Sequence, residues 1–107
     1  MTTPDPKTIV IPGPRIRLSE NDRLRTLLFD EINAGHTNLV LDFHDVEFVD
    51  SSFLGLLIIV LKRATSAGGD LKLCCLRKPL QDIFGLMRLD RLFDTYGTEE
   101  EARASFT

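Results

Sequence analysis

Residues 38–55 read NLVLDFHDVEFVDSSFLG, and this stretch decides the fold expected of the 107-residue chain. Its first part, 38–43, is a short apolar run with a β-branched member, which is typical of a strand covered on both faces. Residues 46–49 continue in an extended pattern. After the polar triplet at 50–52, the segment 53–65 becomes strongly apolar and predicts a helix. A central strand therefore leads, through a short extended link, into a buried helix.

The sequence beyond this helix predicts a second strand. Gly68 and Gly69 supply the left-handed backbone that commonly ends a helix, and residues 71–76 have the pattern of a strand. A strand–helix–strand order implies a right-handed parallel crossover. Pro79 then fits the first turn of another helix, where its missing N–H costs nothing. The buried stripe of that helix is predicted to comprise Leu80, Ile83, Phe84 and Met87.

The N-terminal part of the chain predicts shorter elements. The β-like runs 8–11 and 16–18 are separated by the sequence PGP at 12–14, so they are either two edge strands or one bent strand. Ser19 offers a side-chain oxygen at the N-cap of a helix predicted over about 20–33.

The C-terminal part predicts a short final strand at 92–93 and a last short helix at 102–106. A Thr-x-x-Glu capping box at 98–101 precedes this helix. We therefore expect one α/β domain over residues 1–107, with a flexible N-terminus at 1–7. Its sheet should be mixed but mostly parallel, with about four strands covered by about four helices.

The composition excludes several classes of protein. Hydrophobic residues make up 43% of the chain, which is enough to form a core, and the net charge of −3 lacks the basic excess that nucleic-acid binding needs. The polar N-terminus does not have the pattern of a secretory signal. The apolar run 53–61 is far shorter than the roughly 20 residues of a membrane span. We therefore expect a cytoplasmic protein that binds neither nucleic acid nor membrane.

The two cysteines, Cys74 and Cys75, are adjacent in a predicted strand. Successive side chains of a strand point to opposite faces, and neither cysteine has a sequence-near partner at metal-ligand spacing. We therefore interpret both as structural residues and predict no metal site and no cofactor.

Four segments resemble the STAS family of anti-sigma-factor antagonists. Residues 39–43 and 46–55 are similar to the strand and phosphoacceptor loop of that family, and residues 67–71 and 86–93 are similar to its later strand and helix segments. These segments follow one another in the order and spacing of the family. The resemblance implies a STAS-like α/β fold.

The resemblance also implies a switchable binding module and not an enzyme. By this resemblance, Ser51 is the phosphorylation site, with Ser52 as the less favoured choice, and the partner-binding residues are Asp50, Ser51, Ser52, Phe53 and Leu54. The unphosphorylated protein would bind an anti-sigma factor with serine kinase activity and so release a sigma factor for transcription. A serine phosphatase would reset the switch. Self-association stays open.

Two departures from the family pattern concern the partner. Phe53 stands where the family usually has glycine after the two serines, and residues 14–16 differ from the Glu-Leu-Asp-like element that usually follows a glycine at the place of Gly13. A bulky ring at Phe53 would alter the partner surface.

The residues themselves also allow a plainer interpretation of Ser51 and Ser52. Either serine could cap the following helix by accepting a backbone N–H, which contributes about 1 kcal/mol. As a phosphoacceptor, a serine would gain a charge of about −1.5 to −2, whereas a helix N-terminus favours an anion by only about 0.3–1 kcal/mol. Phosphorylation should therefore change binding more than folding.

Two other functions stay open. A constitutive scaffold subunit of a stress-signalling or lipid-transport complex would dock through the same surface, and Phe53 favours this alternative mildly. Catalysis by a serine would need a nearby base. His36 and His44 are the two histidines of the chain, and we interpret both as solvated loop residues without a triad or metal-ligand signature.

Overall fold

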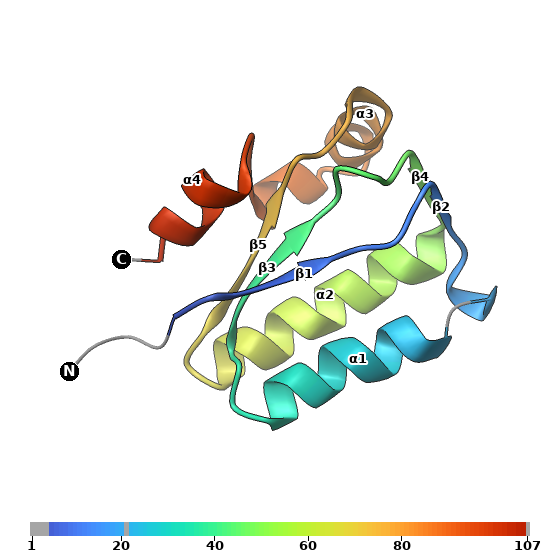
Figure 1. The fold of residues 1–107 in the computed structure, drawn as a ribbon. Coiled ribbons are helices and arrows are strands. Elements are labelled where there is room, and N and C mark those ends of the chain that lie inside the picture. Colours follow the sequence, from blue (N-terminus) through green and yellow to red (C-terminus); the bar gives the residue numbers. More distant parts are fainter. Residues whose placement is uncertain (1–4, 21, 107) are drawn as a thin grey trace.

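The computed structural model describes residues 5–20 and 22–106, which form a parallel sheet between two layers of helices (Figure 1). The main sheet has the strand order β1-β3-β5-β6, and each of its strand pairs is parallel. The strands are β1 (Lys7–Val10), β3 (Asn38–Asp42), β5 (Asp70–Cys74) and β6 (Asp94–Tyr96). The predicted α/β fold with a mostly parallel four-stranded sheet is confirmed.

The helices bury both faces of this sheet. Helices α1 (Asp22–Asn33) and α2 (Ser51–Ser66) pack on one face, and the short α4 (Glu99–Ala104) covers the other (Figure 1). Successive side chains of β3 point to opposite faces of the sheet. Leu39 and Leu41 belong to the main core, whereas Val40 belongs to a small second core under α4. The apolar run of β3 is therefore covered on both faces, as predicted.

Helix α2 connects β3 to the parallel strand β5, as the crossover prediction requires. The helix ends at Ser66, and Gly68 follows with a φ of +88°, which is the left-handed backbone expected after a helix. Helix α3 (Lys78–Leu86) then carries Pro79 in its first turn, as predicted.

A second sheet of two short strands lies beside the start of α2 (Figure 1). In this sheet, β2 (Arg15–Ile16) pairs in parallel with β4 (Phe48–Val49). The runs at 8–11 and 16–18 thus belong to separate strands in different sheets, although Ile16 alone of the second run lies in a strand and Leu18 begins a 3-10 helix. Gly13 lies between the two strands. Glycine is required at this position because a Cβ there would come within 1.8 Å of the backbone oxygen of Asp45.

The structure bears on two N-terminal predictions. β1 begins at Lys7, which pairs with Leu39, so the flexible N-terminus predicted at 1–7 stays a prediction for the residues before Lys7 only. Residues 1–4 lie outside the described part of the chain. Ser19 lies inside the 3-10 helix η1 (Leu18–Glu20) and not directly before α1, and the residue that does precede α1 is outside the described residues.

Three C-terminal predictions also need correction. Met87 is 50% exposed because α3 ends before it, at Leu86. The strand predicted at 92–93 forms two residues later, as β6 at Asp94–Tyr96, and residues 92–93 are the turn that joins it to the 3-10 helix η2 (Leu89–Arg91). The final helix starts earlier than predicted, because the side chain of Thr98 caps it by accepting the backbone N–H of Glu101 at 3.1 Å.

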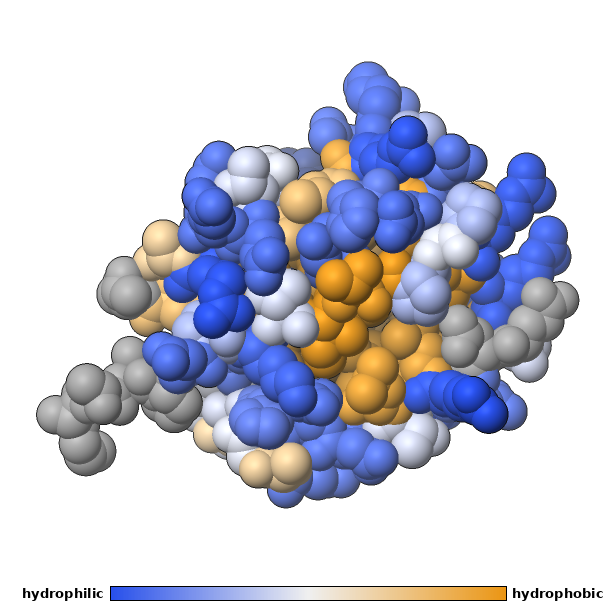
Figure 2. Space-filling model, viewed as in Figure 1, coloured by the Kyte–Doolittle hydropathy of each residue, from blue (hydrophilic) through white to orange (hydrophobic). Residues whose placement is uncertain are grey.

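Apolar side chains gather on the surface over β1 and α1 (Figure 2). Val10 and Leu27 are exposed apolar residues of these two elements. Among the described residues, every helix is too short or too polar to cross a membrane.

Candidate functional site

The start of α2 is held in place by the carboxylate of Asp50. Its Oδ1 accepts the backbone N–H of Phe53 at 2.9 Å, which caps the helix, and its Oδ2 accepts the backbone N–H of Leu18 at 3.1 Å. The backbone N–H of Asp50 also donates to the carbonyl of Ile16 at 3.0 Å. Asp50 therefore joins the N-terminus of α2 to the segment that contains β2 and η1.

Ser51 and Ser52 are the first two residues of α2, and both are exposed. Neither hydroxyl makes a hydrogen bond with any residue that the structure describes. The interpretation of a serine as the helix cap is therefore wrong, because the carboxylate of Asp50 already occupies that role. Both hydroxyls remain free for another chemistry.

The position of Ser51 also has a defined electrostatic environment. The first backbone N–H groups of a helix lack partners within the helix and favour a negative charge nearby. The carboxylate of Asp50 is next to Ser51 in the chain and already accepts two of the local N–H groups. A phosphate on Ser51 would thus meet both a weak attraction and a nearby repulsion, which should nearly cancel.

Phe53 and Leu54 are buried in the main core, with 0% and 3% of their surfaces exposed. The ring of Phe53 packs edge-to-face against Phe43 of the β3–β4 connection, with ring centroids 6.3 Å apart. Phe53 therefore does not alter the outer surface, contrary to expectation. Both side chains face the interior in this conformation, and the partner-binding role expected of them stays a prediction.

The two histidines have carboxylate partners. His36 Nδ1 lies 2.8 Å from Glu31 Oε2, and His44 Nδ1 lies 2.8 Å from Asp42 Oδ1. The hydrogen bond and the charge of Asp42 raise the pKa of His44. Both side chains are about half exposed, but each lies within hydrogen-bond distance of a carboxylate and is not simply solvated. Within the described part of the chain, neither histidine makes a hydrogen bond to Ser51.

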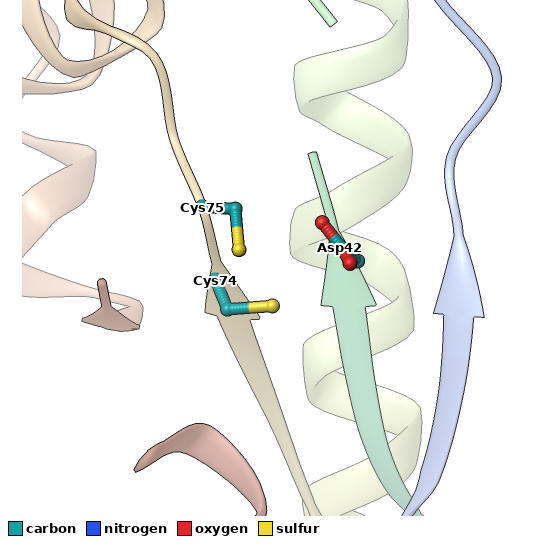
Figure 3. Close-up of side chains that lie close together, drawn as sticks. All are labelled: Asp42, Cys74 and Cys75. Carbon is teal, nitrogen blue, oxygen red and sulfur yellow. The ribbon is translucent and has the colours of Figure 1, made fainter. Parts of the chain in front are cut away.

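A second cluster, absent from the sequence predictions, joins Asp42 at the end of β3 to Cys74 and Cys75 at the end of β5 (Figure 3). The two thiols do not point to opposite faces, because Cys75 has left β5 and has a φ of +62°. Strand alternation therefore ends at Cys74. The register that pairs Asp42 with Cys74 is the signal that sequence reasoning lacked.

The family follows from a comparison with known proteins. The family model described as "STAS domain" matches residues 2–102. The chain belongs to the STAS family. A relative named "Putative anti-sigma factor antagonist", from Thermotoga maritima, is 30% identical over 92% of this chain and 88% of its own length.

Solved STAS structures share the fold. One of them is the crystal structure described as "a putative anti-sigma factor antagonist" from Thermotoga maritima. It matches with a TM-score of 0.83 and 26% sequence identity, and the match covers 99% of this chain and 91% of that one. The phosphorylated form of the Bacillus cell fate determinant SpoIIAA matches with a TM-score of 0.74 over 100% and 96% of the two chains. At 22% identity, the second likeness concerns the fold alone.

Proposed function

We propose that this STAS domain is a phosphorylation-switched binding module for an anti-sigma factor with serine kinase activity. The observation that carries the proposal is the exposed, unbonded hydroxyl of Ser51 on a helix start that Asp50 holds in place. The names of the relatives support the kind of partner. By binding this partner in the cytoplasm, the unphosphorylated domain would release a sigma factor for transcription.

Phosphorylation of Ser51 would act on the complex more than on the fold. A phosphate of charge about −1.5 to −2 gains only about 0.3–1 kcal/mol from a helix N-terminus, and the adjacent Asp50 opposes this gain. The same charge pressed against an acidic or apolar partner surface costs several kcal/mol. A penalty of about 3 kcal/mol lowers affinity roughly a hundredfold. A serine phosphatase would restore binding.

The test compares two variants of Ser51 in binding to the kinase partner. Ser51→Ala should bind like the unmodified domain, whereas Ser51→Asp should bind at least about tenfold more weakly, since each 1.4 kcal/mol is a factor of ten. Calorimetric titration of the partner recovered by pull-down gives both affinities. Equal, tight binding by the two variants would sink the switch.

The neighbouring serine provides the matched control. Ser52 is equally exposed and belongs to the same helical turn, so Ser52→Asp adds the same charge one residue away. Phosphosite mapping after incubation with the kinase and ATP should find the phosphate on Ser51 in the unmodified domain. A phosphate found on Ser52 would transfer the proposed role to that residue.

The scaffold alternative has lost its supporting feature. Phe53 favoured a constitutive docking surface when its ring was expected outside, but the ring is buried. A scaffold would form a complex whose affinity ignores the charge at Ser51, so the same titrations separate the two functions.

A further inference from the structure

The C-terminal ends of β3 and β5 bring two thiols and a carboxylate together. In the register of the sheet, Asp42 lies opposite Cys74, which in turn lies opposite Tyr96 of β6. One carboxylate oxygen of Asp42 and the two sulfur atoms all lie within 4.8 Å of one another. Figure 3 shows the side chains converging on the space between the two strands. Ligands of parallel α/β sheets commonly bind at this end of the strands.

The backbone of Cys75 is what completes the cluster. Its φ of +62° is uncommon for a residue with a side chain and costs about 1–3 kcal/mol. An extended residue at this position would direct its thiol to the face opposite Cys74. Because the chain turns here, the Cys75 sulfur joins that of Cys74, while its backbone N–H still donates to the Tyr96 carbonyl at 3.0 Å.

The carboxylate of the cluster is oriented by a second residue. The backbone N–H of His44 donates to Asp42 Oδ1 at 2.9 Å, and the His44 ring nitrogen lies 2.8 Å from the same oxygen. Neither contact uses Oδ2. Metal-binding carboxylates are typically held by such hydrogen bonds, which fix their direction.

We propose that Asp42, Cys74 and Cys75 form a binding site for a thiophilic divalent cation of the Zn²⁺ type. Two thiolates and one carboxylate suit this class of ion, and three protein ligands leave the fourth tetrahedral position open. Binding forms two metal–sulfur bonds and one metal–oxygen bond, breaks two S–H bonds, releases two protons to solvent and changes no oxidation state. Zinc–sulfur bonds of about 2.3 Å place two sulfurs roughly 3.8 Å apart in a tetrahedral site, a separation within the 4.8 Å spread of the cluster.

The cluster is sheltered but reachable. Cys74 is fully buried, whereas Cys75 is half-buried and lines a hollow together with Tyr96 and Gly97. Burial raises the pKa of both thiols, which favours their protonated form when no ion is bound. A bound cation reverses this preference, because its charge stabilises the thiolates.

The test is a metal titration of the full chain, reduced and freed of metal. Zn²⁺ added in competition with a chromophoric chelator should bind at one equivalent, and Co²⁺ should give a thiolate-to-metal charge-transfer band. Cys75→Ser and Asp42→Asn should each weaken Zn²⁺ binding at least about tenfold. Asp82→Asn is the matched control, because Asp82 is an exposed carboxylate that pairs with Lys78 in α3 and lies outside the cluster, so affinity should not change.

A second measurement needs no variant and therefore stands even if a substituted chain unfolds. Zn²⁺ should slow the alkylation of the half-buried Cys75 thiol in the native chain, as mass spectrometry of the labelled chain can show. Equal alkylation with and without Zn²⁺ would overturn the proposal. So would Zn²⁺ binding as tight in Asp42→Asn as in the unmodified chain, since two adjacent thiols alone would then explain it.

Discussion

At the scale of single residues, the carboxylate of Asp50 joins two segments that are far apart in the sequence. One oxygen caps α2 at Phe53, and the other holds the backbone of Leu18 in η1. The exposed Ser51 therefore starts from a fixed position relative to the neighbouring surface. Such preorganisation favours recognition, because little conformational freedom is lost on binding.

We predict that Asp50→Ala lowers the free energy of unfolding by about 2 kcal/mol, since a lost cap costs about 0.5–2 kcal/mol and the N–H of Leu18 also loses its partner. Asp50→Asn should cost about half as much, because its amide has one acceptor oxygen for the two N–H groups. Urea unfolding followed by circular dichroism measures both. Ser51→Ala should change the free energy of unfolding by no more than about 0.5 kcal/mol. If Asp50→Ala lost no more stability than Ser51→Ala, this role of Asp50 would be refuted.

At the scale of elements, helix α2 and the loop that follows it show where glycine is required and where it is not. Gly55 lies inside the helix, and a Cβ added there meets nothing within 4 Å. Gly69 lies between α2 and β5, where a Cβ would come within 2.0 Å of the backbone oxygen of Thr37. The loop after the helix thus depends on a close backbone approach that a side chain would prevent.

These two glycines give a matched pair of substitutions to the same residue. Gly55→Ala should stabilise the protein by about 0.5–1 kcal/mol, because alanine loses less backbone freedom in a helix. Gly69→Ala should destabilise it by more than about 1 kcal/mol, because backbone atoms must move to remove the clash. Thermal and urea unfolding of the two variants provide the comparison. A tolerated Gly69→Ala would show that the contact with Thr37 relaxes freely.

At the scale of the whole molecule, an ion pair ties the first strand to the end of α1. Lys7 Nζ lies 2.9 Å from Glu31 Oε2, and His36 Nδ1 lies 2.8 Å from the same oxygen. The hydrogen bond from Lys7 lowers the pKa of Glu31 below its ordinary value of 4.5, with burial opposing and His36 assisting. Glu31 thus stabilises the fold above pH 4.5, and this stability disappears as pH falls through the lowered pKa.

We therefore predict that Glu31→Gln lowers the free energy of unfolding at neutral pH by no more than about 1 kcal/mol, as is usual for partly exposed ion pairs. The variant should also lose less stability than the unmodified protein on acidification below pH 4.5. Urea unfolding at neutral and acidic pH tests both. Asp30→Asn, an exposed carboxylate in the same helix, is the control. If Glu31→Gln and the unmodified protein lost the same amount of stability on acidification, Glu31 would not be the carboxylate that stabilises the fold through its lowered pKa.

The sequence by itself determined the order of the elements and the place of the exposed serines. The apolar run of β3, the apolar helix α2 and the glycines after it are local patterns, since their periods and turn residues depend only on neighbours in the chain. The same holds for Pro79 in the first turn of α3 and for the Thr98 cap of α4. Their fixed order was also enough to indicate the STAS family.

The tertiary structure alone decided which side chains meet. Asp50 caps α2 through a local contact with Phe53, but its second oxygen reaches Leu18, a contact that no local pattern encodes. Phe53 is interior because Phe43 packs against it. Asp42 reaches the two cysteines only through the register of β3 with β5 and the left-handed turn at Cys75. Register and backbone turns come from the packing of the whole chain, so sequence spacing does not reveal them.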